Sequence, residues 1–345
     1  MKELDEAFEL LHRDAREAPG DLAGARARLM AELDGVTPLR KRRRWVLPAA
    51  AAAVVLLAAG TAGVVVSRQR TLTVATASEV LLRAADSIDV GAVAPKVGPG
   101  QYLLRVERVR SGRSNAEKPD STVGFTYLVE QEISRWIPAN DRDVWQETRK
   151  VLGPPRLIGQ NLPEGQVPPP LGIQPTDQGQ WAGACGDFFP EAKPKKVCGD
   201  PDDWDSPEFY ARLPRDPDEL YGRLKELTAN RGSAPDTMFH YAIQILATGM
   251  MPADLRAQWY RAIAKIPGIQ IAHQATTVDG REGVALGLTT EHEQRQLIID
   301  PTTGEFIGER TVAGVQPYQA WIRPGVETYS SSITTSVVNG RGQTK

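Results

Sequence analysis

The sequence predicts an α+β protein in three parts: a short helical hairpin, one transmembrane helix, and a curved antiparallel sheet with a helical insertion. Three observations support this prediction. Residues 45–66 contain no charge, five consecutive basic residues precede them, and alternating apolar residues flank a block of helix-start signals. We place the hairpin at 1–44, the span at 45–67 and the remaining domain at 68–345.

The composition excludes several classes of function. The chain of 345 residues is 41% hydrophobic and 24% charged, which is typical of a globular protein. A net charge of −2 provides no cationic field, so we expect no nucleic-acid partner. Two Cys and four His leave little for metal chemistry, and the sequence contains no GxSxG, GxxxxGK[ST] or HExxH motif. We therefore expect neither enzymatic activity nor a cofactor.

The run from Trp45 to Val66 predicts a membrane span. As a helix rising about 1.5 Å per residue it would extend roughly 33 Å, enough to cross a hydrocarbon core of about 30 Å. A buried helix of a soluble protein would show a polar face, and a signal peptide rarely follows so long a charged segment. The lipid bilayer is therefore an expected partner.

Charges beside this run predict its orientation. Only Arg68 and Arg70 follow it, whereas a basic cluster precedes it. Because basic residues stay on the cytoplasmic side, we expect a single-pass protein of the cell membrane, with a cytoplasmic N-terminus and an extracytoplasmic C-terminal domain. The residues that set this orientation are Arg40, Lys41, Arg42, Arg43 and Arg44.

Residues 1–44 predict two amphipathic helices separated by Pro19-Gly20. A hairpin of this size is too small to bury its own apolar faces well. We expect it to dock on a partner protein, to dock on a second copy, or to stay partly disordered; the alternative is a simple leader to the membrane anchor. The apolar stripe consists of Leu4, Phe8, Leu11, Leu22, Leu29 and Leu33.

The large domain predicts strands on both sides of a helical insertion. Thr76 to Glu79 has the form of a capping box and opens a helix. Four further helices, two of them opened by Ser-Pro and Asp-Pro, are expected within 206–267. The expected strands lie near 102–106, 123–129, 143–152, 269–277, 284–288, 297–299, 306–312 and 326–338.

Residues 153–184 hold seven Pro and six Gly, which predicts a long surface loop without helix or strand. Cys185 and Cys198 follow this loop. Two Cys in one extracytoplasmic domain most often pair, and a bridge across this separation would restrict the unfolded chain by about 3 kcal/mol. Neither a CxxC motif nor a nearby His supports a metal or redox site, so we expect a structural disulfide.

Two charged clusters are candidate sites. Asp200, Asp202, Asp203 and Asp205 lack the Gly and terminal Glu of an EF-hand loop, which favours a solvated acidic loop over a calcium site. The segment Glu291-His292-Glu293 falls between two expected strands, where a turn is favoured over a catalytic base.

Turn and capping segments spread over most of the chain resemble those of a known family. They are Trp204 with Ser206–Phe209, Leu213–Pro217, Ile266–Gly268, Asp279–Ala285 and Asp300–Arg310. With the helical arm, the basic stop and the Ala-rich span, they resemble an actinobacterial family of single-pass membrane proteins often encoded beside extracytoplasmic-function sigma factors. The resemblance implies a membrane-anchored regulator of anti-sigma-like layout. Unlike zinc-containing anti-sigma domains, the arm contains no Cys.

These observations lead to three hypotheses. The first is a regulatory or sensory membrane protein that modulates a sigma factor or another cytoplasmic partner through residues 1–44 in response to an envelope signal. The alternative is a membrane-anchored extracytoplasmic module whose curved sheet binds lipid or lipoprotein. The third, an envelope enzyme, requires a cleft with converging titratable groups.

Overall fold

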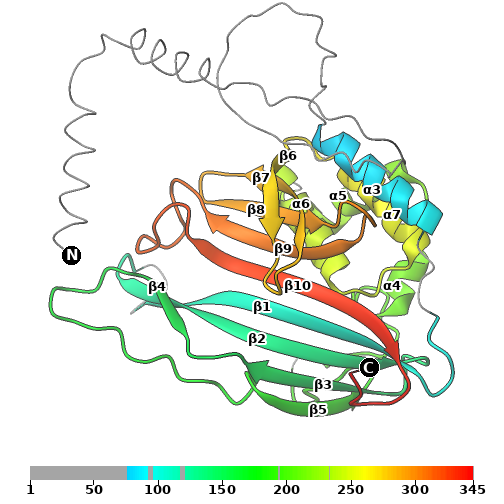
Figure 1. Cartoon of the computed structure of the whole chain (residues 1–345), viewed down its shortest axis with the longest axis horizontal. Coiled ribbons are helices and arrows are strands. Elements are labelled where there is room, and N and C mark those ends of the chain that lie inside the picture. Colours follow the sequence, from blue (N-terminus) through cyan, green and yellow to red (C-terminus); the bar gives the residue numbers. More distant parts are fainter. Residues whose placement is uncertain (1–75, 92–95, 117–120, 193–194, 233, 345) are drawn as a thin grey trace, which may run out of the picture. The chain divides into compact units, whose positions relative to one another are not determined.

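The computed structural model describes residues 76–91, 96–116, 121–192, 195–232 and 234–344 (Figure 1). They all belong to one compact unit, Arg70–Lys345, and residues 1–69 are assigned to a separate unit. The predicted hairpin at 1–44 and the predicted span at 45–67 therefore lie outside the described residues.

The predicted membrane localisation is contradicted. Among the described residues no helix is long and apolar enough to cross a membrane. The longest of them, α3 (Ala77–Gly91), has 15 residues and includes Glu79 in its first turn. At about 1.5 Å per residue it measures roughly 22 Å, which is shorter than a hydrocarbon core of about 30 Å.

The strands of the described residues form one antiparallel sheet of ten strands in the order β5-β3-β2-β1-β10-β9-β8-β7-β6, with β4 also paired to β2. The first and last strands, β1 and β10, are neighbours in the middle of the sheet, so the two halves of the unit form a continuous surface. The strands are β1 (Tyr102–Ala116), β2 (Gly124–Pro138), β3 (Val144–Val151), β4 (Arg156–Gln160), β5 (Gly179–Ala184), β6 (Gln270–Thr276), β7 (Glu282–Thr289), β8 (Glu293–Ile299), β9 (Phe306–Ala313) and β10 (Glu327–Val338).

The remaining helices lie between β5 and β6 in the chain and begin where the sequence signals predict. Pro occupies the first turn of three of them, where its missing N–H costs little. Asp216 caps α5, since its carboxylate accepts hydrogen bonds from the N–H groups of Asp218 and Glu219. The helices are α4 (Pro207–Arg212), α5 (Pro217–Thr228), the short 3-10 helix η1 (Ala229–Arg231), α6 (Pro235–Ala247) and α7 (Ala253–Ile263).

The predicted fold class needs correction. The described part of the chain is mainly an antiparallel sheet with few helices, and its helices pack on one part of that sheet (Figure 1). The Pro/Gly-rich segment 153–184 does not run entirely as a loop, because β4 and β5 lie within it. Its Pro residues lie before β4 or between the two strands, so the backbone groups of both strands are free to pair with β2 and β3.

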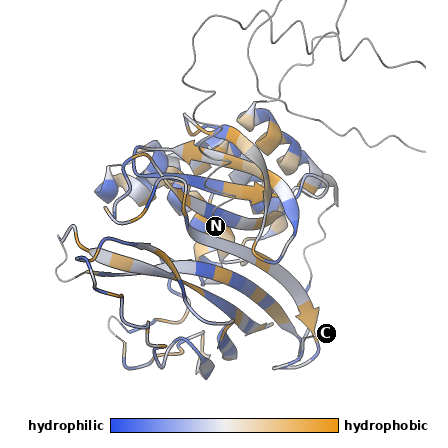
Figure 2. Ribbon diagram, turned by 60° about the vertical axis from the view of Figure 1, so that its left-hand side comes forward, coloured by the Kyte–Doolittle hydropathy of each residue, from blue (hydrophilic) through white to orange (hydrophobic). Residues whose placement is uncertain are grey.

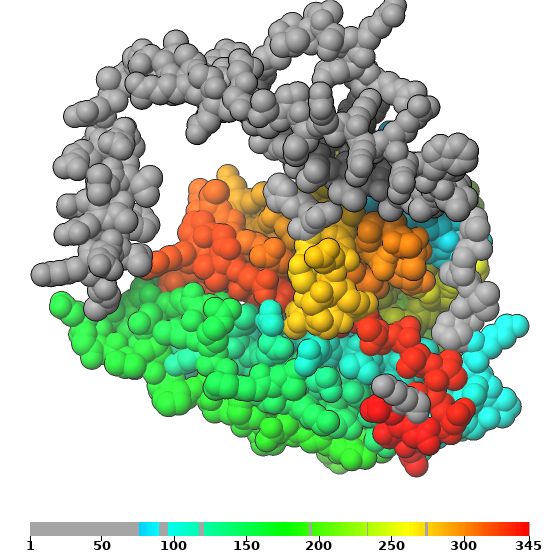
Figure 3. Space-filling model, viewed as in Figure 1, coloured from blue at the N-terminus to red at the C-terminus, as the bar shows by residue number. Residues whose placement is uncertain are grey.

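The main apolar core lies between the helices and strands β7 to β9. Leu81 of α3, Phe239 of α6 and Trp259 of α7 are fully buried there against Leu286 and Leu297 of the sheet. The long strands of the sheet carry hydrophilic residues as well as apolar ones along their length (Figure 2). On the face drawn in Figure 3, strands β1 to β5 (cyan and green) border the C-terminal strands (orange and red). The inner face of β1 and β2 carries the charged side chains Arg105, Glu107 and Arg135 beside a second, smaller apolar cluster of Ile137, Trp145 and Phe188.

Candidate functional site

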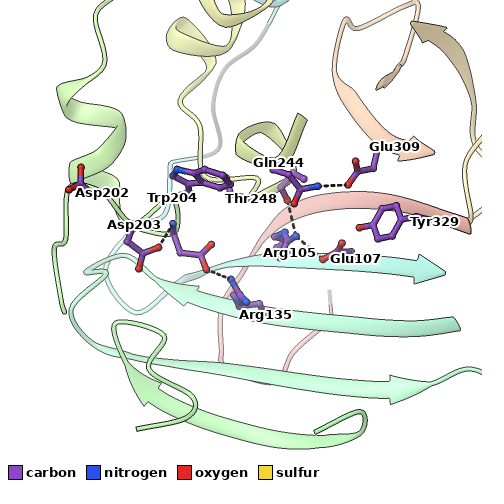
Figure 4. A pocket seen from close by; sticks show the side chains of 12 residues that line it. Arg105, Glu107, Arg135, Asp202, Asp203, Trp204, Gln244, Thr248, Glu309 and Tyr329 are labelled. Atoms are coloured by element: carbon purple, nitrogen blue, oxygen red, sulfur yellow. Dashed lines mark hydrogen bonds and ion pairs between the residues drawn. The ribbon is translucent and has the colours of Figure 1, made fainter. Parts of the chain in front are cut away.

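A cleft lies between this charged part of the sheet, helix α6 and the loop at 202–205 (Figure 4). Its volume is about 510 Å³, within the range of about 300–1,000 Å³ that is usual for small-molecule sites. The sheet contributes Arg105, Glu107, Arg135, Glu309 and Tyr329; α6 and the residue after it contribute Gln244, Ala247 and Thr248; the loop contributes Asp202, Asp203, Trp204 and Asp205.

Arg105 occupies the floor of the cleft. The register of β1 places it opposite Arg135 of β2, and its Nη2 donates to Glu107 Oε2 at 2.7 Å and to the carbonyl oxygen of Ala247 at 2.8 Å. That carbonyl ends α6, where the helix dipole favours a cation. Arg105 is only 7% exposed, and its Nε has no hydrogen-bond partner among the described residues.

Arg135 joins the sheet to the loop. Its guanidinium donates to Glu147 Oε2 at 2.7 Å and to Asp205 Oδ2 at 2.9 Å. Burial acts to lower the pKa of Arg135, but the charges of Asp205 and Glu147 outweigh burial and raise it. Burial likewise acts to raise the pKa of Asp205, yet Arg135 and Arg105 hold it below its ordinary value. Arg135 and Asp205 therefore stay ionised and paired at neutral pH.

The loop presents Trp204 at the cleft. The Asp203 carboxylate accepts a hydrogen bond from the Asp205 N–H at 2.9 Å, and Lys196 Nζ donates to it at 2.6 Å. The Tyr210 hydroxyl donates to the Trp204 carbonyl oxygen at 2.7 Å, and the Trp204 ring meets that of Tyr241 edge to face at 5.3 Å. Trp204 is thus held from both its backbone and its ring.

The same contacts account for the acidic cluster at 200–205. Asp200 accepts a hydrogen bond from the Asp202 N–H at 2.9 Å, while Asp203 and Asp205 are paired with basic residues. Within the part of the chain that the structure describes, no group of three or more His, Cys, Asp or Glu side chains could hold a metal ion. We therefore assign no metal to this loop.

Glu309 is the most deeply buried charged group of the cleft, at 1% exposure. Its Oε1 accepts a hydrogen bond from Gln244 Nε2 at 3.1 Å, whereas its Oε2 has no partner of good geometry in the described residues. Burial raises the pKa of Glu309 to about 7; the charge of Arg295 and the hydroxyl of Tyr329 oppose the shift, and the charge of Glu107 adds to it. Burial and the charge of Glu309 in turn raise the pKa of Tyr329.

A second cavity of about 310 Å³ adjoins the cleft and shares Gln244 and Tyr329 with it. His240 lies here in contact with Arg295, whose Nη2 donates to Glu293 Oε1 at 2.6 Å. Burial, followed by the charge of Arg295, lowers the pKa of His240 to about 4. Together the two cavities form one polar groove along α6.

Cys185 and Cys198 are at disulfide distance, with their Cα atoms 5.5 Å apart, so the predicted pairing is confirmed. The bridge joins the end of β5 to the segment that leads into the loop at 202–205. It therefore anchors the chain to the end of β5 just before the residues that form one wall of the cleft.

Of the other predicted site residues that the structure describes, Glu293 lines the second cavity of the groove. The stripe Leu4, Phe8, Leu11, Leu22, Leu29, Leu33 and the basic residues Arg40 to Arg44 lie outside the described residues. Glu291-His292-Glu293 forms the turn into β8, as predicted: the Thr290 hydroxyl accepts hydrogen bonds from two of its N–H groups, and the His292 ring lies against Tyr318.

The groove residues were missed because both faces of β1 are covered. The apolar residues Tyr102, Leu104 and Val106 alternate along β1, and Leu104 is buried against Trp136 and Val338 on one face. Arg105 and Glu107 point to the other face, where they line the cleft. Opposite charges two residues apart in a strand were the available signal, since they share a face.

Comparison of the chain with protein-family models, curated proteins and solved structures yields no match.

Proposed function

We propose that this chain is a regulatory protein of the sensory type, whose folded unit binds a small polar ligand in the cleft. The observation that carries the proposal is Arg105 Nε, a buried atom that has no hydrogen-bond partner among the described residues although its side chain lines an open cleft. An unpaired buried polar atom costs about 1–3 kcal/mol, so a ligand that bonds to it would recover that free energy.

A polar ligand is favoured over the lipid of the alternative hypothesis. An apolar chain in this cleft would remove water from Arg105, Glu107 and Arg135 without offering them hydrogen bonds, which is costly. The lining therefore supports recognition of hydrogen-bonding groups.

Binding is also favoured over catalysis. The cleft has the converging titratable groups that an enzyme would need, and a pKa near 7 would suit Glu309 as an acid or base. Glu107, Asp203 and Asp205, however, are each committed to an ion pair. Neither His nor Cys lines this cleft among the described residues, and its remaining carboxylate, Asp202, is exposed.

Thermal unfolding of the full-length chain with a panel of sugars, amino acids, polyamines and nucleotides tests the binding proposal. A ligand at one hundred times its Kd stabilises by about 2.7 kcal/mol, which should raise Tm by about 5–10 °C. The shift should persist in Trp181→Ala and disappear in Trp204→Ala, because both rings are half-buried but only Trp204 lines the cleft. A panel that shifts no Tm overturns the proposal.

The regulatory part of the proposal is supported by the sequence of residues 1–44. Their apolar stripe would bind a sigma factor or another regulatory protein, in line with the anti-sigma-like resemblance. The full-length chain should retain such a protein in affinity purification followed by mass spectrometry. The double variant Leu11→Glu/Leu29→Glu should lose it, whereas Arg13→Glu/Ala27→Glu, on the opposite faces of the helices that the sequence predicts, should keep it. Equal recovery with both double variants contradicts this role.

A further inference from the structure

Acidic side chains outnumber basic ones along the cleft (Figure 4). The guanidinium groups of Arg105 and Arg135 share the lining with five carboxylates. These carboxylates belong to Glu107, Asp202, Asp203, Asp205 and Glu309. They would still be in the majority if Glu309, whose pKa is about 7, were protonated. The lining therefore favours a ligand of positive charge.

Ion pairs with residues outside the lining do not remove this acidic excess. Lys196 pairs with Asp203. Arg135 also pairs with Glu147, which in turn binds Arg149. When these three partners are included, six carboxylates still face four cations.

Two of the lining carboxylates have no ion pair within the described part of the chain: Asp202, which is exposed, and Glu309, which is buried. A cation that enters the cleft can therefore pair with Glu309 without displacing a basic residue. Trp204 adds an aromatic ring, and the face of such a ring attracts cations. Because no group of three or more His, Cys, Asp or Glu side chains in the described residues could hold a metal ion, an organic cation is favoured.

Arg105 requires a second feature of the ligand. Its side chain lines the cleft and is nine-tenths buried, and its Nε–H has no acceptor among the described residues. A polyamine has only donors on its ammonium groups, so it would leave this N–H unpaired. A carboxylate accepts a charge-assisted hydrogen bond from a guanidinium, which is stronger than one to a neutral acceptor. A ligand that meets both requirements joins a carboxylate to cationic groups and keeps a net positive charge.

We infer that the cleft binds a basic amino acid, whose side-chain cation pairs with Glu309 beside the ring of Trp204 and whose carboxylate accepts a hydrogen bond from Arg105 Nε. This inference rests on the proposed binding function and names its ligand class.

Isothermal titration of the full-length chain with two matched sets of probes tests the inference. L-lysine is compared with cadaverine, which lacks the carboxylate, and with Nε-acetyl-L-lysine, which lacks the side-chain cation. L-arginine is compared in the same way with agmatine and L-citrulline. We expect at least one of the two basic amino acids to bind at least tenfold more tightly than both of its analogues.

Two variants assign these preferences to residues. Arg105→Lys keeps the positive charge but lacks the Nε–H, so it should lose the preference for the amino acid over the analogue without a carboxylate. Glu309→Gln should lose the preference over the analogue without a side-chain cation. The matched controls Arg108→Lys and Glu132→Gln change residues outside the cleft that pair with each other, and they should keep both preferences. Because each readout is a ratio of two affinities in one variant, a general loss of stability does not imitate the result.

The outcomes distinguish this inference from the proposed function. Equal binding of a basic amino acid and either of its analogues overturns the inference, and so do preferences that Arg105→Lys and Glu309→Gln leave unchanged. Failure of all six probes, with a Tm shift by a sugar or a nucleotide that Trp204→Ala abolishes, overturns the inference and leaves the polar-ligand site. Failure of these probes and of the whole ligand panel overturns both.

Discussion

As the pH rises from 4.5 to 7, the variant Glu309→Gln should become more stable relative to the wild-type chain. The difference between their free energies of unfolding should change by about 3 kcal/mol. Burial holds the pKa of Glu309 near 7 in the folded chain, against an ordinary value of 4.5. Between these pH values the folded chain still holds a proton that the unfolded chain has released. The stability that protonated Glu309 contributes below pH 4.5 is therefore progressively lost as the pH rises to 7. Gln does not titrate and does not suffer this loss. Urea unfolding at several pH values measures the difference.

The comparison must be made between variant and wild type because His240 acts in the opposite direction. Its pKa is lowered to about 4, so the stability it contributes is present above pH 6.5 and lost as the pH falls toward 4. Both chains contain His240, so its effect cancels in the difference. Glu132→Gln is the control, since Glu132 lies on the opposite face of β2 beside Arg108; its curve should follow the wild type within about 1 kcal/mol. Parallel curves for wild type and Glu309→Gln would refute the burial effect.

Removing the disulfide by the double substitution Cys185→Ser/Cys198→Ser should lower stability by about 3 kcal/mol. In the unfolded chain the bridge restricts the conformations that the segment between the two Cys can adopt. For a unit of this size the loss corresponds to a Tm decrease of about 6–12 °C, measurable by calorimetry. An unchanged Tm would show that the bridge does not form in solution.

The same variant tests how the cleft wall is held. The segment after Cys198 carries Trp204 and Asp205, and the latter is tied to Arg135. We expect the double Ser variant to bind the cleft ligand more weakly at a temperature where it remains folded, because the bridge limits the freedom of that wall. A wild-type chain treated with reductant is the matched control and should behave like the variant.

Local signals predicted most elements within the described residues. Ser206-Pro207 and Asp216-Pro217 start α4 and α5, because Pro suits a first helical turn and a preceding polar side chain can cap it. Asp279-Gly280 turns β6 into β7, with Gly280 at a φ of 89° that other residues avoid. Such signals depend on neighbours within a few residues, so they can be identified without knowledge of the fold.

Signals of longer range were less reliable. Pro and Gly density concealed β4 and β5, whose pairing with β2 and β3 depends on residues far away in the chain. The membrane localisation inferred from an uncharged run is contradicted by the helices of the described unit, which are too short and too polar to cross a bilayer. The hydropathy of a segment does not show which distant segments of the chain will pair with it.

By itself the sequence determined where the helices of the described unit begin, where its strands other than β4 and β5 lie, that Cys185 and Cys198 pair, and that no familiar catalytic motif is present. Only the tertiary structure decided that β1 lies beside β10, which brings Arg105 and Glu309 into one cleft under α6. The physical reason is that strand register and burial are set by pairing between distant segments. A charged residue in a strand has the same sequence pattern whether it faces water or the floor of a binding site.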